Sequence, residues 1–167
     1  MAASRFQCIL FDWGGTLMSE EGPVHVPMEL WPEVRAIEGA KETLAALAPR
    51  HRLAIATNAT VSKRDMIERA LARVSLLDYI SDIFCFTEIG ARKDSRAFWS
   101  RVCAVLELGP SELAMVGDTL DQDVLGPRKY GVFSVWFNEN RRSELDAEGV
   151  LTIYRLPDLV PLLLDAS

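Results

Sequence analysis

Polar residues that are capable of chemistry stand at the ends of three apolar runs in this 167-residue chain. Asp12, Thr57 and Asp118 each come at the end of a run with the length and composition of a buried strand. Open α/β sheets bind their ligands at the carboxyl ends of the strands. A carboxylate at that edge can act as a nucleophile or as a ligand of a hard divalent cation. The three positions therefore predict a polar site at one edge of a parallel sheet.

Four short motifs occur in order along the chain and include these residues. They are Asp12-Trp13-Gly14-Gly15-Thr16-Leu17, Thr57 with Asn58 after an apolar strand, Lys93 ahead of a helix, and Gly117-Asp118 followed by Asp123. In order and spacing, the set resembles the haloacid dehalogenase superfamily, whose first motif reads Asp-x-Asp-Gly-Thr-Leu. A polar residue in a loop after a strand is weak evidence by itself. The resemblance therefore depends on all four motifs together, and it spans nearly the whole chain.

The resemblance implies a phosphatase that works through an aspartyl-phosphate. Asp12 would be the nucleophile, as aspartate is in other enzymes that form this intermediate. Thr57 and Lys93 would complete the catalytic set and, with the backbone amide of Asn58, would hold the phosphoryl oxygens. Phosphoryl transfer depends on positioning and charge neutralisation. The expected partner is a phosphorylated substrate, either small or macromolecular.

The resemblance also implies a magnesium cofactor. Mg²⁺ prefers hard oxygen ligands and neutralises charge on a transferring phosphoryl group. Its protein ligands would be Asp12, Asp118 and the backbone carbonyl of Gly14. Asp123 would support the site from its edge, and Gly15 would allow the tight turn after the strand.

Gly14 departs from the family pattern, because the phosphatases carry a second aspartate there. That aspartate protonates the leaving oxygen and then deprotonates the attacking water. A positioned acid/base typically contributes about 10²–10⁴-fold to the rate. Three interpretations remain open: a substrate with a good leaving group, a substitute proton donor, or a protein that binds phosphate without turnover. The candidate substitutes are His25, since histidine is a residue type suited to proton transfer, and Glu20 and Glu21 in the same loop.

Two other branches of the superfamily also lack the second aspartate. The haloacid dehalogenases need no magnesium, whereas this chain keeps the Gly117-Asp118 pattern of the metal users. The phosphonoacetaldehyde hydrolases need a cap domain with a Schiff-base lysine, and the stretch between Leu17 and the second strand is too short for such a cap. A phosphatase is therefore the leading hypothesis. The alternatives are a catalytically weak phosphate-binding or regulatory protein and, less favoured, a non-phosphate hydrolase such as a dehalogenase.

Alternating apolar runs and amphipathic segments predict an α/β, Rossmann-like three-layer sandwich with helices on both faces of a mostly parallel sheet. The predicted strands are 6–11, 53–57, 83–86, 113–116, 132–137 and, as a sixth, 150–154, and the expected order of the first five is 5-4-1-2-3. The predicted helices are 31–48, one opened by a capping box of Ser62 and Asp65, 94–106 and 157–164. Residues 1–167 are expected to form a single core domain without a large cap, with a short flap at 18–30 over the site.

Composition and charge narrow the functional class. Twenty-four acidic against eighteen basic residues give a net charge of −6, and no basic cluster stands out, so no nucleic-acid partner is expected. No segment reaches the length of a signal peptide or a membrane span. Cys8, Cys85 and Cys103 lack metal-ligand or redox spacing. A cytoplasmic protein with no membrane partner is therefore expected, and its oligomeric state is left open.

Overall fold

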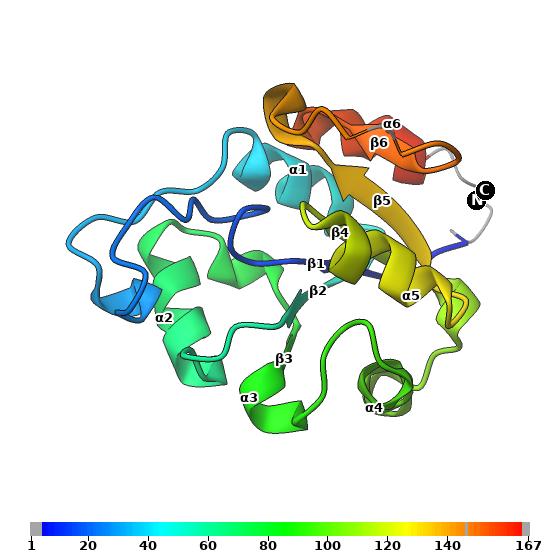
Figure 1. The fold of residues 1–167 in the computed structure, drawn as a ribbon, viewed down its shortest axis with the longest axis horizontal. Coiled ribbons are helices and arrows are strands. Elements are labelled where there is room, and N and C mark those ends of the chain that lie inside the picture. The colour runs from blue at the N-terminus through cyan, green and yellow to red at the C-terminus, as the bar shows by residue number, and fades with distance from the viewer. Residues whose placement is uncertain (1–4, 146, 165–167) are drawn as a thin grey trace.

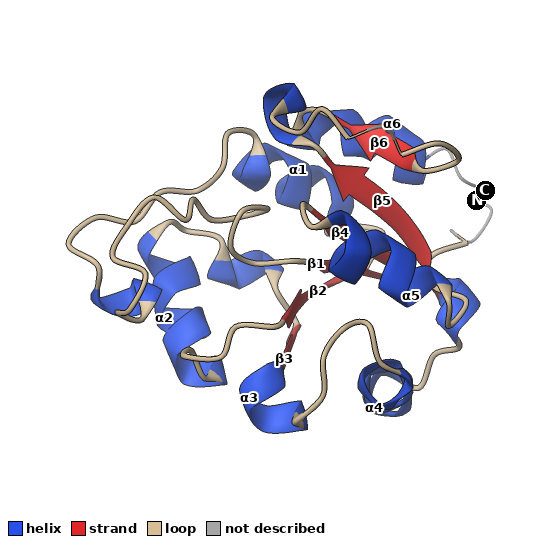
Figure 2. Cartoon of the chain, viewed as in Figure 1, coloured by secondary structure: helices blue, strands red, loops and turns tan. Residues whose placement is uncertain are grey.

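Six parallel strands form one sheet in the computed structural model, which describes residues 5–145 and 147–164 (Figures 1 and 2). The strands are β1 (Cys8–Phe11), β2 (Arg52–Thr57), β3 (Asp82–Cys85), β4 (Leu113–Gly117), β5 (Phe133–Phe137) and β6 (Leu151–Ile153). Their order is β3-β2-β1-β4-β5-β6. The predicted order is confirmed, read from the opposite edge, with β6 added beside β5.

Helices cover both faces of this sheet. They are α1 (Ala40–Leu47), α2 (Arg64–Arg73), α3 (Phe86–Ile89), α4 (Arg96–Leu106), α5 (Gly126–Arg128) and α6 (Leu159–Leu164). Side chains alternate between the faces of a strand, so β1 contributes to two cores. Ile9 and Phe11 pack with α1, α2 and α6, whereas Cys8 and Leu10 pack with α4 on the other face. The three-layer α/β architecture is thus confirmed.

The two apolar cores explain why the central strands are apolar throughout. A parallel sheet covered on both faces buries most side chains of its central strands, and all four residues of β1 are buried. Trp31, Trp99 and Trp136 are also buried, at 7%, 1% and 3% exposure, so each belongs to the interior. Among the described residues, no helix is both long enough and apolar enough to cross a membrane.

The predicted helix at 31–48 is wrong over its first half. Helix α1 begins at Ala40, directly after Gly39, whose φ of 79° lies in the left-handed region. Before that point the backbone runs across the chain: the amide of Ile37 donates to the carbonyl of Leu17 at 2.8 Å. Residues that pair with a neighbouring segment cannot form i to i−4 bonds, so local helical periodicity is overridden here by tertiary pairing.

The capping box predicted at Ser62 and Asp65 is not formed. Lys63 is the N-cap of α2, without a side-chain cap bond, and Asp65 instead pairs with Arg69 at 3.0 Å, one turn further on. Helix starts are less determined by sequence than helix bodies. Other boundaries also differ from the prediction by one or two residues. Among them, β3 ends at Cys85 because Phe86 begins α3, α4 begins at Arg96, β5 begins at Phe133, and α6 follows a 3-10 turn at Leu156–Asp158.

Residues 18–39, here called the loop segment, connect β1 to α1. Their regular structure is a 3-10 turn at Met28–Leu30 and isolated bridges that join Met18 to Gly14 and to Ala36. Met28 and Trp31 insert into the core from this segment, so it is anchored to the body of the protein. In Figure 1 it runs as a blue-to-cyan chain above α2 and beside the ends of the central strands.

Candidate active site

The register of the central strands brings the first and last motifs together. Strand β1 pairs with β4, and Phe11 lies opposite Val116. The amide of Asp12 then donates to the carbonyl of Val116 at 2.9 Å. Asp118 follows Val116 by two positions, so both carboxylates lie at the same edge of the sheet. Strand β2 pairs with β1 on the other side and ends at Thr57 at that edge.

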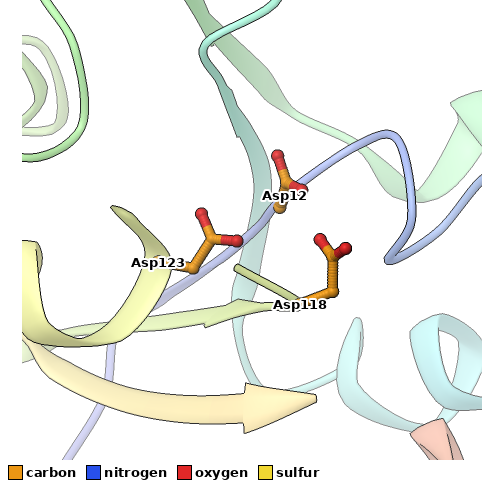
Figure 3. Close-up of side chains that lie close together, drawn as sticks. All are labelled: Asp12, Asp118 and Asp123. Atoms are coloured by element: carbon orange, nitrogen blue, oxygen red, sulfur yellow. The ribbon is translucent and has the colours of Figure 1, made fainter. Parts of the chain in front are cut away.

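Three carboxylates meet at this edge. Each of Asp12, Asp118 and Asp123 offers an oxygen, and these oxygens lie within 4.8 Å of one another. Figure 3 shows them converging from the end of β1, the end of β4 and the helical turn after β4. That turn, Leu120–Leu125, is a π-helix, and Asp123 is fully buried within it, whereas Asp121 is exposed.

Lys93 supplies the positive charge between these carboxylates. Its Nζ lies 2.7 Å from Oδ1 of Asp12 and 2.6 Å from Oδ1 of Asp123, and the side chain is buried. The indole Nε1 of Trp99 donates to the Lys93 carbonyl at 2.6 Å, which ties this backbone to α4. Arg92, the neighbouring cation in sequence, is exposed. The fold thus assigns the buried position to the lysine.

Burial and charge crowding shift the pKa values of these groups. Burial first, and then the negative charge of Asp12, raise the pKa of Asp118 to about 8. The same two causes raise the pKa of Asp123, although Lys93 opposes them. Burial disfavours the charged form of Lys93, but Asp12 and Asp123 outweigh it and raise the pKa of the ammonium group. With all three carboxyl groups ionised, the single cation would leave the site net negative, which is an environment that favours a divalent cation.

Thr57, Asn58 and Lys93 share a cavity of about 310 Å³ with Asp12 and Asp118. The Thr57 hydroxyl accepts a bond from the Ala59 amide at 3.1 Å, which leaves its own proton available for donation. The Asn58 side chain accepts from the Lys93 amide at 2.9 Å and donates to Oε1 of Gln122 at 2.6 Å. The Asn58 side chain therefore braces the site, a role that the motif did not reveal.

Two glycines of the first motif have different reasons to lack a side chain. Gly15 has a φ of 79°, and a Cβ there would lie 2.5 Å from Oδ2 of Asp118. A Cβ on Gly14 would instead overlap Oε1 of Glu20 and lie 3.0 Å from Cδ and Cγ of the same residue. The space beside Gly14 is therefore filled by the carboxyl group of Glu20.

Glu20 belongs to none of the four motifs, and the sequence offered it only as one of three candidate proton donors in the loop after the first motif. It lines the cavity with Asp12 and Lys93, although the residue as a whole is exposed. Burial of the carboxyl group, and then the charge of Asp12, raise its pKa. His25 and Glu21 are exposed and do not line this cavity. Glu20 follows Gly14 by six positions, a spacing that does not by itself predict contact between two residues of a loop.

Comparison with known proteins agrees with this architecture. The family model of haloacid dehalogenase-like hydrolases matches residues 24–137, well over half of the chain. The chain therefore belongs to the haloacid dehalogenase-like hydrolases. The matched range begins after Asp12, so the first motif rests on the sequence and the geometry.

Two curated relatives and one solved structure illustrate the similarity. The ribulose-1,5-bisphosphate 5-phosphatase of Halopiger xanaduensis is 32% identical over 114 residues, which cover 67% of this chain and 46% of that protein. The phosphoserine phosphatase of Thermus thermophilus is 36% identical over 118 residues, covering 69% and 43%. An uncharacterized protein from Listeria monocytogenes serotype 4b has a TM-score of 0.83 at 24% identity, covering 96% and 98%. The chain spans about half the length of the curated relatives it matches.

Proposed function

We propose that this chain is a magnesium-dependent phosphohydrolase that acts on a phosphate ester through an aspartyl-phosphate on Asp12. The observation that carries the proposal is the convergence of Asp12, Asp118 and Lys93 in one cavity at the carboxyl edge of the sheet. The phosphatase relatives support phosphate esters as the substrate class. The substrate itself, small or macromolecular, is left open.

The donor set fits a magnesium ion. Asp123 already uses Oδ1 in its ion pair with Lys93 and Oδ2 as acceptor from the Thr119 amide at 2.9 Å. Asp123 is therefore better suited to support the site than to ligate. Asp12, Asp118 and the carbonyl of Gly14 would hold the ion, which is the all-oxygen chemistry that Mg²⁺ prefers. When bound, the ion would neutralise charge on the phosphoryl oxygens.

The side chains of the cavity can then divide the chemistry among themselves. A carboxylate oxygen of Asp12 attacks phosphorus while the bond to the ester oxygen breaks. The Thr57 hydroxyl and the Lys93 ammonium donate hydrogen bonds to the phosphoryl oxygens and counter their charge. Water next attacks the aspartyl-phosphate, releasing inorganic phosphate and restoring the Asp12 carboxylate.

Hydrolysis of 4-nitrophenyl phosphate tests this function directly. Asp12→Asn removes the nucleophile while keeping the side-chain shape, so we expect turnover with magnesium to fall on the order of 10³-fold or more. Chelation of magnesium should abolish turnover of the unchanged protein. Equal rates for the unchanged protein and Asp12→Asn would reject the mechanism.

The second candidate function is a phosphate-binding or regulatory protein with little turnover, and Gly14 is the observation that favours it. Such a protein would bind magnesium together with the phosphate mimic fluoroberyllate, yet release no nitrophenol above the rate of Asp12→Asn. Metal-independent activity on a haloacid would instead favour a dehalogenase. The two measurements, binding and turnover, separate these functions.

A further inference from the structure

The first motif of this chain lacks a side chain where the resemblance implies an acid/base, but the volume is occupied. The carboxyl group of Glu20 lies where the Cβ of a residue at position 14 would project. The φ angle of Gly14 is outside the left-handed region, so this backbone would accept an ordinary side chain. The carboxyl group of Glu20, six positions further along the chain, thus occupies the space that a side chain at position 14 would fill.

The chain turns back on itself to deliver Glu20 to this position. The amide of Gly15 donates to the carbonyl of Met18 at 2.8 Å, which closes the loop directly after Asp12. The amide of Ser19 then donates to the carbonyl of Arg35 at 2.9 Å, which fixes the backbone directly before Glu20. Both bonds belong to the backbone, so the placement of Glu20 follows from the path of the chain.

Glu20 also lines two neighbouring cavities of the site. It lines the site cavity with Asp12 and Thr57, and it lines a second cavity of about 540 Å³ together with Asp118. A group at the wall between the two cavities can reach the ester oxygen on one side and water on the other. Glu21 lines the second cavity but not the site cavity, and its carboxylate pairs with Arg35 at 3.4 Å.

We propose that Glu20 is the general acid and base of this enzyme and takes the place of the aspartate that position 14 lacks. This inference rests on the phosphohydrolase function proposed above. As the bond between phosphorus and the ester oxygen breaks, the carboxylic acid of Glu20 gives its proton to that oxygen. The carboxylate of Glu20 then takes a proton from the water that attacks the aspartyl-phosphate, and the acid form is restored.

A pair of aryl phosphates tests the acid role. Phenol is a poorer leaving group than 4-nitrophenol, so it needs the proton more. We expect Glu20→Gln to lower kcat/KM for phenyl phosphate by about 10²–10⁴-fold and to lower kcat/KM for 4-nitrophenyl phosphate much less. The variant should also release an initial burst of nitrophenol, because the aspartyl-phosphate accumulates when its water is not deprotonated.

Glu21→Gln is the matched control, being the same substitution on the adjacent residue. It should leave both rates and the melting temperature unchanged. An equal fall for both esters in Glu20→Gln, or no fall, would overturn the acid role. Asp12→Asn separates this outcome from failure of the proposed function: if Asp12→Asn is inactive while Glu20→Gln is unaffected, the phosphohydrolase stands and the role of Glu20 does not.

A double-variant experiment tests the shared location. Gly14→Asp alone should give no gain, because Glu20 already supplies a carboxyl group beside this position. In a Glu20→Ala background the space is free, and Gly14→Asp should recover at least about tenfold of the lost kcat/KM for phenyl phosphate. A gain from Gly14→Asp alone, or no recovery in the double variant, would overturn the proposed equivalence of the two carboxyl groups.

Discussion

At the scale of single residues, Asn58 joins two parts of the site that come from distant stretches of the chain. Its side-chain oxygen accepts a hydrogen bond from the Lys93 amide. Its side-chain nitrogen donates to Gln122, in the turn that also contains Asp123. Hydrogen bonds of this kind fix the position of groups that must act with sub-ångström accuracy. The ammonium group between Asp12 and Asp123 therefore depends on Asn58 for its placement.

Asn58→Ala should consequently reduce activity without removing a group that reacts. We expect kcat/KM for 4-nitrophenyl phosphate to fall by roughly 10- to 100-fold, since small misplacements are costly. Gln122→Ala is the control, because it removes one bond to Asn58 and keeps the bond to Lys93. A loss in Gln122→Ala as large as in Asn58→Ala would show that the bond to Lys93 is unimportant.

At the level of elements, helix α2 holds the loop segment in place through hydrogen bonds and an ion pair. Arg73 of α2 donates from Nη1 to the carbonyl of Glu29 at 2.9 Å and to that of Trp31 at 2.7 Å, and from Nη2 to that of Pro32 at 3.2 Å. Arg69, one turn earlier, pairs with the Glu29 carboxylate. One helix thus satisfies several backbone carbonyls that would otherwise lack partners in an irregular segment.

Arg73→Ala should loosen the loop segment while leaving the sheet intact. We expect faster amide hydrogen exchange in residues 18–39 and little change in β1 or β4, because local opening needs only local contacts to be lost. Arg64→Ala is the matched control: Arg64 is on the same helix, but its partners are Glu88 and the Ile83 carbonyl. If amide hydrogen exchange in Arg73→Ala became faster throughout the chain, β1 and β4 included, the result would indicate global destabilisation instead.

At the scale of the whole molecule, the site stores unfavourable charge that depends on pH. In the metal-free protein the pKa of Asp118 is raised from 3.8 to about 8. For an acid with a raised folded-state pKa, stability is fully present below the unfolded pKa and is lost as pH rises through the folded pKa. The free energy of unfolding should therefore fall between about pH 4 and about pH 8.

Urea denaturation of the metal-free protein across this pH range is the measurement. Asp118→Asn removes the titrating group, so this variant should show a flatter pH profile and exceed the unchanged protein in stability at pH 8. Magnesium should restore stability at pH 8 in the unchanged protein and much less in Asp118→Asn, because a ligand stabilises the state that binds it. Stability that rises steadily with pH in the metal-free protein would contradict the expected charge crowding.

The layers could be predicted because they follow from patterns that local sequence carries, whereas the strand order is what the resemblance to the haloacid dehalogenase superfamily implies. Apolar runs of strand length, separated by amphipathic segments, allow few topologies once crossovers are right-handed. The helix start at Ala40 could not be predicted, since the residues before it bond to the beginning of the loop segment. Boundaries of this kind depend on a partner elsewhere in the chain, which local propensity cannot register.

The shared edge of Asp12, Thr57 and Asp118 could be inferred from the sequence, because the carboxyl ends of neighbouring parallel strands meet. Which further groups join them depends on how the chain folds in three dimensions. It buries Lys93 and leaves Arg92 exposed, and it lays the Glu20 carboxyl group over Gly14. The physical reason is that proximity through space depends on how the loops fold back, and this path is set by long-range backbone bonds and packing.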